Sequence, residues 1–321
     1  CFRRRTPHPR NPHIKSLSPL GKVLFGYNAN RPLLNLSYAL NYRWSGFLTW
    51  SYHAVNLAIH VLAAWLLWQI LHRILGLGRA AATAGSLLFL TMPAASEPVV
   101  YLASRSSSLA ALLVLAGFYC YARMPDLAGW RKCGWGIVAW LALLAGLGAK
   151  ESALVLPLLL GLWEWLFRRD ARFVLLRPRL WPFLLLFPAL LAIWFVRKLL
   201  PTDQMDWHFA LSQCYIIPFY YLSSWLWPVN INADPDPPRW GHEHVLLLPS
   251  GLLLLGLVVL LAWHFRRRTP WPLWGVGWIL LSFLPTSSLL PQADLAFDRH
   301  GYLPAVGWWM LVAWGLDSFR R

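Results

Sequence analysis

Charged residues are scarce in this chain of 321 residues. Only 13% of the residues are Asp, Glu, Lys or Arg, whereas 58% are hydrophobic. A soluble globular domain carries about 25% charged residues. The deficit leaves too few polar side chains to cover a surface that faces water, so the composition excludes a soluble domain. Tryptophan, which favours the membrane–water boundary, accounts for 22 residues. We therefore predict an integral membrane protein.

Cysteine is also scarce, with four residues spread along the chain. No C-x-x-C motif is present, and no histidine lies at a spacing typical of zinc ligands. The pattern therefore predicts neither a disulfide framework nor a metal centre, and it indicates no required cofactor. Whether a divalent cation takes part is left open.

The basic residues outnumber the acidic ones, 29 to 13, for a formal charge of +16. Such an excess is typical of proteins that bind nucleic acid or anionic lipid. Here the basic residues stand in short clusters between apolar runs and form no single patch. We therefore expect the lipid bilayer as a partner and no nucleic acid.

Long apolar runs fill most of the chain after residue 50. Five of them approach the ~20 residues that a bilayer crossing needs, and they cover 53–74, 99–122, 180–199, 245–265 and 271–290. Four shorter runs cover 80–93, 133–148, 152–167 and 302–316. Helix is the expected backbone state, because lipid offers no partner to backbone N–H and C=O groups. The sequence predicts an all-α polytopic bundle, GT-C-like, of about nine transmembrane helices. It also predicts an interfacial or re-entrant segment near 213–230.

The distribution of Lys and Arg predicts the orientation. If the loop after 53–74 is cytoplasmic, 15 basic residues lie in cytoplasmic loops, and only six lie on the opposite side after residue 50. We predict two regions: an extracytoplasmic segment with an amphipathic helix at 1–50, and a multi-pass transmembrane domain at 51–321. Nine of the 13 acidic residues also fall on the outer side. This bias suggests a polar site there, although ordinary solvated loops would explain most of it.

Glu97 and Arg105 stand where ionisable residues are costly and often functional. The first belongs to Ser96-Glu97-Pro98, which we expect to open the helix at 99–122, with Ser96 as the N-cap. Glu97 could simply favour the dipole of that helix. Arg105 follows about two turns further in. It points either into the bundle, as a functional residue, or back towards the headgroups.

Two more charged pairs lie at helix ends. Lys150 and Glu151 are adjacent, so we expect them to serve different partners; a plain hairpin turn is the alternative. Arg299, after Asp298, is a natural phosphate ligand because its guanidinium offers paired donors, although a lipid headgroup anchor explains it as well. Glu164, by contrast, suits a structural i,i+4 pair with Arg168.

Six stretches, taken in order and spacing, resemble the membrane domain of the transmembrane-and-tetratricopeptide-repeat family. That family belongs to the GT-C glycosyltransferases and is related to the protein O-mannosyltransferases. The stretches are RPLLNLSYALNY at 31–42, YHAVNL at 52–57, PAASEPVVY at 93–101, AKESA at 149–153, FLPTSS at 283–288 and DRHGYLPAVG at 298–307.

The resemblance implies a transferase that moves a sugar from a polyprenyl-phosphate carrier to a hydroxyl of a protein or glycan. The active face would be extracytoplasmic, and we expect a multi-pass protein of a bacterial inner (plasma) membrane. On this interpretation the phosphate-binding residues are Arg105, Lys150 and Arg299, with Glu97, Glu151 and Asp298 as supporting acids. Arg31, Asn35 and Tyr302, within the matching stretches, are further candidate site residues.

The chain departs from the family pattern at its start. The family's catalytic acid lies shortly before the stretch that matches 11–14, where this chain reads RRRTPHPR at 3–10. The first acidic residue is Glu97, so the catalytic residue is unknown and we expect a chain truncated at both ends. One alternative is a non-catalytic polyprenyl-phosphate-binding protein, such as a flippase or ligase subunit. Another is a transporter, which would show related halves; the sequence shows no such repeat.

Overall fold

The computed structural model describes residues 15, 17–26, 29–126, 128–167, 179–183, 207–228, 235, 237, 246–286 and 296–320. Within these residues every regular element is a helix, which confirms the predicted all-α class. The α-helices are α1 (Leu20–Phe25), α2 (Pro32–Ser45), α3 (Thr49–Gln69), α4 (Arg79–Thr91), α5 (Ser96–Val100), α6 (Arg105–Arg123), α7 (Gly129–Ala149), α8 (Leu156–Phe167), α10 (Trp207–Ile216), α11 (Leu222–Leu226), α12 (Leu247–Phe265), α13 (Trp271–Phe283) and α14 (Asp298–Arg320).

Four helical stretches of the described residues are long and apolar enough to cross a membrane. They are Thr49–Ile74, Leu102–Arg123, Gly129–Ala149 and Leu247–Phe265, and a shorter apolar helix covers Trp271–Phe283. A membrane protein is therefore supported. The total of about nine crossings stays a prediction, and nearly all of the apolar run at 180–199 lies outside the described residues.

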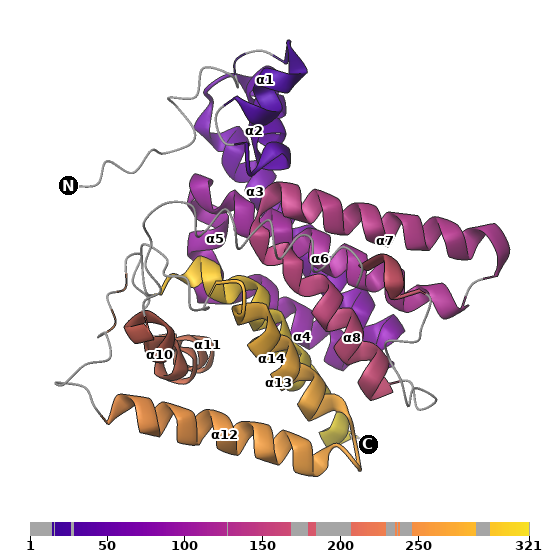
Figure 1. The fold of residues 1–321 in the computed structure, drawn as a ribbon, viewed down its shortest axis with the longest axis vertical. Coiled ribbons are helices and arrows are strands. Elements are labelled where there is room, and N and C mark those ends of the chain that lie inside the picture. Colours follow the sequence, from indigo (N-terminus) through magenta and orange to yellow (C-terminus); the bar gives the residue numbers. More distant parts are fainter. Residues whose placement is uncertain are drawn as a thin grey trace.

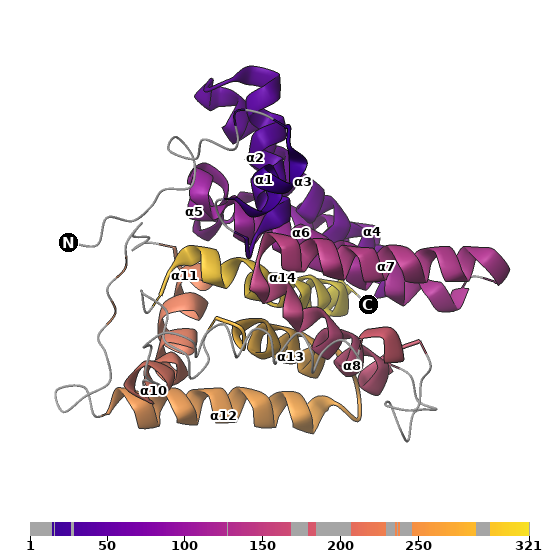
Figure 2. The same ribbon diagram turned by 45° about the horizontal axis from the view of Figure 1, so that its top comes forward.

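The bundle is built around α6 and α14, which contact each other. The helix α6 also packs on α3 and α7, and α14 also packs on α4 and α13. Figures 1 and 2 show α1 and α2 projecting at one end, beyond the start of α3. In both views α7 lies on one side of the bundle and α12 on the other. Little of α12 is buried. Among the described α-helices it packs mainly on α10 and α13 (Figure 1).

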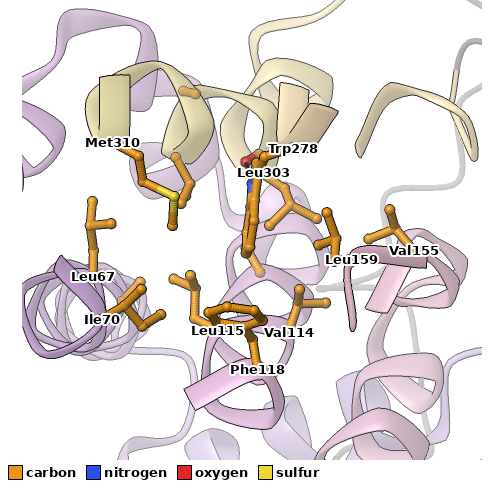
Figure 3. Packing of buried hydrophobic residues seen from close by; sticks show 14 of the residues in the cluster. Leu67, Ile70, Val114, Leu115, Phe118, Val155, Leu159, Trp278, Leu303 and Met310 are labelled. Carbon is orange, nitrogen blue, oxygen red and sulfur yellow. Dashed lines mark hydrogen bonds between the residues drawn. The ribbon is translucent and has the colours of Figure 1, made fainter. Parts of the chain in front are cut away.

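The hydrophobic core lies where α3, α6, α8, α13 and α14 meet (Figure 3). Trp278 is fully buried there, and its ring packs edge-on against Phe118 with centroids 5.6 Å apart. Its Nε1 donates to the Leu303 carbonyl at 3.0 Å, so the polar end of the ring is satisfied. A Cβ at Gly307 would lie 2.8 Å from the Gly275 carbonyl. Glycine at this crossing therefore lets the backbones of α13 and α14 approach closely.

The helix predicted over 99–122 is divided, and the N-cap prediction was wrong. Ser96 lies inside the short α5, whose N-cap is Ala95, and Tyr101 is extended. A 3-10 turn over Leu102–Ser104 follows, and α6 begins at Arg105. One reason is that the Leu102 carbonyl accepts a hydrogen bond from Tyr38 of α2. Such a contact between distant segments cannot be inferred from periodicity.

Two other predicted segments have different bounds. The run at 271–290 ends its helix at Phe283, two residues before Pro285, which cannot donate a helical hydrogen bond. The segment expected near 213–230 is helical from Trp207 to Leu226, and it contains a π-helical turn at Ile217–Tyr221. In Figure 2 this segment runs across the direction of α12 towards the start of α14. Its position relative to a membrane stays a prediction.

Candidate functional site

Glu97 connects α5 to the start of α14. Its carboxylate accepts the Arg299 backbone N–H at 3.0 Å and the Arg299 Nη1 at 2.6 Å. Ser104 Oγ donates to the same carboxylate at 3.3 Å. The first N–H groups of a helix have no partner within the helix, and its N-terminus favours negative charge. Glu97, which we expected to favour the dipole of its own helix, also bonds the N-terminus of α14 and favours the dipole of that helix. It also fixes the position of Arg299.

Lys150 is a buried cation between α7 and the 3-10 turn at Glu151–Val155, with 6% of its surface exposed. Its Nζ donates to Ser107 Oγ of α6 at 2.8 Å. Among the described residues no carboxylate lies within ion-pair distance of this ammonium. Burial lowers the pKa of Lys150 to about 7, and the Glu151, Arg31, Arg299 and Glu97 charges act on it as well. An ammonium that is buried beside a neutral hydroxyl is costly until an anion joins it.

Glu151 and Arg31 form an ion pair beside Lys150. Arg31 Nη2 lies 3.2 Å from Glu151 Oε1, and both side chains are partly exposed. Arg31 is the N-cap residue of α2, so the pair ties α2 to the turn after α7. The prediction that Lys150 and Glu151 serve different partners agrees with these contacts: Lys150 bonds Ser107, and Glu151 bonds Arg31.

Asp298 is the first residue of α14 and is 4% exposed. Tyr220 of the π-helical turn donates to its Oδ1 at 3.1 Å. The buried Oδ2 has no hydrogen-bond partner among the described residues. Burial raises the pKa of Asp298 to about 6; the Tyr220 hydrogen bond opposes this shift, and the nearby Glu97 charge adds to it. The carboxyl therefore exchanges its proton close to neutral pH.

Arg105 is close to Glu97 in the sequence, but its side chain makes a separate set of contacts, which we call the Arg105 network. It is fully buried, so the snorkelling alternative does not hold. Its Nε donates to Asn56 Oδ1 at 2.6 Å, and its Nη2 donates to Asn41 Oδ1 at 2.9 Å and to the Tyr52 carbonyl at 3.1 Å. A fourth acceptor is the Ser37 carbonyl, 3.5 Å from Nη1. The guanidinium also stacks on Tyr38, 4.5 Å from the ring centroid. These contacts join α2, α3 and α6.

The structure thus brings five of the six predicted phosphate and acid residues into one region, the Lys150 cluster. We define this cluster by Glu97, Lys150, Glu151, Asp298 and Arg299, together with Arg31. The charges of four of them act on Lys150, and the Glu97 charge also acts on Asp298. The cluster lies at the end of the bundle where α5 meets the start of α14 (Figure 1). Arg105 is the exception, because its donors bond acceptors on α2 and α3.

The remaining candidates lie elsewhere. Tyr302 is buried, and its hydroxyl lies 2.6 Å from Nδ1 of His60, which is also buried. Asn35 is buried and donates to the Leu24 carbonyl at 3.0 Å. Glu164 pairs with Arg179, while its predicted partner Arg168 lies outside the described residues.

Sequence reasoning missed several polar partners of these charges. Ser107 holds Lys150, and Tyr220 holds Asp298. The signal for Ser107 was present, because Ser106, Ser107 and Ser108 form a run of hydroxyls in an otherwise apolar helix. Asn56, inside the apolar helix α3, gave a similar signal for the Arg105 network. In the part of the chain that the structure describes, no three His, Cys, Asp or Glu side chains gather as a metal site.

Fold and site together define a helical membrane protein with a buried charged cluster at one end of its bundle. Its curated relatives specify the class further. The chain is 33% identical over 132 residues to "Protein O-mannosyl-transferase Tmtc1" of Drosophila melanogaster. It is 32% identical over 120 residues to "Protein O-mannosyl-transferase TMTC2" of Mus musculus, and 31% identical over 128 residues to the tmtc2 protein of Xenopus laevis. No protein-family model and no solved structure matches the chain.

These matches confirm the relationship to the transmembrane-and-tetratricopeptide-repeat family that the six stretches indicated. They cover 41%, 37% and 40% of this chain, but only 15%, 14% and 15% of the respective relatives. The chain therefore corresponds to a small part of each relative. For this chain, the activity that the relatives' names describe is therefore a proposal.

Proposed function

We propose that this chain is the membrane domain of a glycosyltransferase that transfers mannose from a polyprenyl-phosphate carrier to a protein hydroxyl on the extracytoplasmic side. The names of the relatives support mannose and a protein acceptor. The charge bias of the loops supports the extracytoplasmic side, because it predicts that all residues of the Lys150 cluster lie outside. The polyprenyl-phosphate carrier follows from the chemistry of the cluster and from the family resemblance.

The observation that carries the proposal is the buried ammonium of Lys150, which has no carboxylate within ion-pair distance among the described residues. In the proposed reaction the acceptor hydroxyl gives its proton to a general base, and its oxygen forms a bond to the sugar C1 while the bond from C1 to the phosphate oxygen breaks. The phosphate leaves with the electron pair and gains negative charge. A cation held in a water-poor site stabilises that charge strongly, because little reorganisation is needed. Lys150 and Arg299 are placed to do this, with Glu97 and Glu151 orienting the cations around them.

Arg105 stays a predicted phosphate ligand, but its contacts favour another role. Four acceptors and an aromatic ring already engage its guanidinium. We propose that Arg105 is a positioning residue, which holds α2 against α3 and α6. Since Arg31 begins α2 and pairs with Glu151, this position also determines one wall of the Lys150 cluster.

A transfer assay in proteoliposomes tests the proposed function. The longest natural protein that contains this chain would receive polyprenyl-phosphate mannose and an acceptor protein rich in Ser and Thr, and carrier binding would be measured alongside. We expect both transfer and binding, with both reduced in Lys150→Met. Binding without transfer would instead support the alternative of a non-catalytic carrier-binding protein. The absence of both binding and transfer would refute the proposal.

A further inference from the structure

An apolar cavity of about 120 Å³ lies between α12 and the rest of the bundle. Its lining comes from four helical segments and includes Ile217, Leu222, Leu255, Val259, Ile279 and Leu311. A cavity holds water only where polar groups can bond it, and almost none of the described lining is polar. Within a membrane bundle the ligand class that suits this cavity is a hydrocarbon chain.

The π-helical turn at Ile217–Tyr221 connects this cavity to the Lys150 cluster. Ile217 and Pro218 line the cavity. Two and three residues later, Tyr220 donates to Asp298, and Tyr221 donates to the Phe297 carbonyl at 3.1 Å. Tyr221 also accepts the Phe297 backbone N–H at 3.2 Å. One side of the turn therefore contacts the cavity, and the other holds the residues that precede Arg299. Turns of this kind are frequent at functional sites.

The helix α14 runs between the Lys150 cluster and the cavity, so its length gives the distance between them. Asp298 begins it, and Leu311 lines the cavity. At about 1.5 Å of rise per residue, thirteen residues correspond to roughly 20 Å along the helix. A lipid with its phosphate at the cluster would extend its chain to this depth. The cavity and the cluster are therefore spaced as the two ends of one amphipathic ligand.

We propose that the cavity beneath α12 binds the hydrocarbon chain of a lipid phosphate, and that the π-helical turn transmits its occupancy to residues 297–299. A bound chain would press on Ile217 and Pro218 and so hold Tyr220 and Tyr221 in contact with Asp298 and Phe297. The phosphate-binding end of α14 then becomes ordered when a chain of sufficient length is present. The inference rests on the proposed function only in naming phosphate as the other end of the ligand.

Farnesol, which has the chain but no phosphate, separates the two ideas. Hydrogen exchange of the backbone amides at 297–303 would be measured in nanodiscs that hold the 321-residue chain, with and without farnesol. We expect farnesol to slow exchange on the order of tenfold. The cavity-filling variant Val259→Trp should abolish this protection. Leu253→Trp is the matched control, because Leu253 lies on the same helix but is 75% exposed and outside the cavity lining.

A photoreactive farnesyl phosphate with a diazirine near the end of its chain locates the site directly. We expect cross-links on Ile217–Trp225 and Leu254–Val259, with loss of these products in Val259→Trp alone. Labelling only of outward residues such as Leu253, or farnesol protection that survives Val259→Trp, would overturn the inference. Failure of the proposed function has a different signature: farnesol protection and cross-links persist, but Lys150→Met binds farnesyl phosphate as well as the wild type does.

Discussion

Arg105 and Lys150 are two buried cations at the same end of the bundle, but their surroundings differ. Arg105 donates to four neutral oxygen acceptors and stacks on a tyrosine, so most of its donors are satisfied within the protein. Lys150 donates to one hydroxyl and has no ion-pair partner among the described residues. A buried polar group without partners costs free energy. We infer from the comparison that Arg105 stabilises the fold, whereas the proposed function assigns a ligand to Lys150.

Replacement of Arg105 should give the largest loss of stability. Arg105→Met leaves the Asn41 and Asn56 oxygens without their donor, and each buried acceptor left unsatisfied costs about 1–3 kcal/mol. We expect a large drop in the unfolding temperature of the purified chain. Arg43→Met, on the exposed side of α2, is the control and should change little. A normal unfolding temperature combined with lost lipid-phosphate binding would make Arg105 a ligand residue after all.

Replacement of Glu97 should have the next largest effect. Glu97→Gln keeps the shape of the side chain but removes the charge that faces Arg299 and the N-terminus of α14. Hydrogen bonds to charged groups contribute about 1.5–3 kcal/mol, so we expect the unfolding free energy to fall by roughly this amount. Faster hydrogen exchange at residues 297–303 should accompany the loss. Unchanged exchange there would show that Glu97 does not hold the start of α14.

The pH dependence of stability gives the next effect. Burial lowers the pKa of Lys150 to about 7, below the ordinary value of 10.5. Between these two values the unfolded chain binds a proton that the folded chain does not, so stability rises with pH across this window. From pH 7 to pH 9 we expect the wild type to gain about 2 kcal/mol relative to Lys150→Met. A difference that is flat or falls with pH would mean that Lys150 is already compensated.

Removal of the Arg31–Glu151 pair should have the smallest effect. Both side chains are more than a quarter exposed, at 28% and 29%, and such pairs contribute about 0–1 kcal/mol. We expect Arg31→Gln to change the unfolding temperature only slightly. A loss as large as that of Arg105→Met would show that α2 is held by this pair and not by the Arg105 network.

The sequence predicted the helical class and most helix positions, because apolar runs of membrane length leave the backbone few other states. The bias of the loop charges predicts that Glu97, Lys150 and Arg299 lie on one side of the membrane, which stays a prediction. The sequence could not predict that α6 begins at Arg105, or that Arg105 faces Asn41 and Asn56. These contacts join residues that lie about 50 or more positions apart in the chain, and periodicity within one helix carries no information about them.

The account rests on the claim that Lys150 binds the phosphate of a lipid, and a comparison of farnesyl phosphate with farnesol tests it most directly. Binding of both compounds would be measured for the wild-type chain, Lys150→Met and Lys150→Arg in nanodiscs. We predict that the wild type prefers farnesyl phosphate at least tenfold, about 1.4 kcal/mol. Lys150→Met should lose this preference without a fall in its unfolding temperature, and Lys150→Arg should keep part of it. An equal preference for the phosphate in the wild type and in a folded Lys150→Met would contradict the claim.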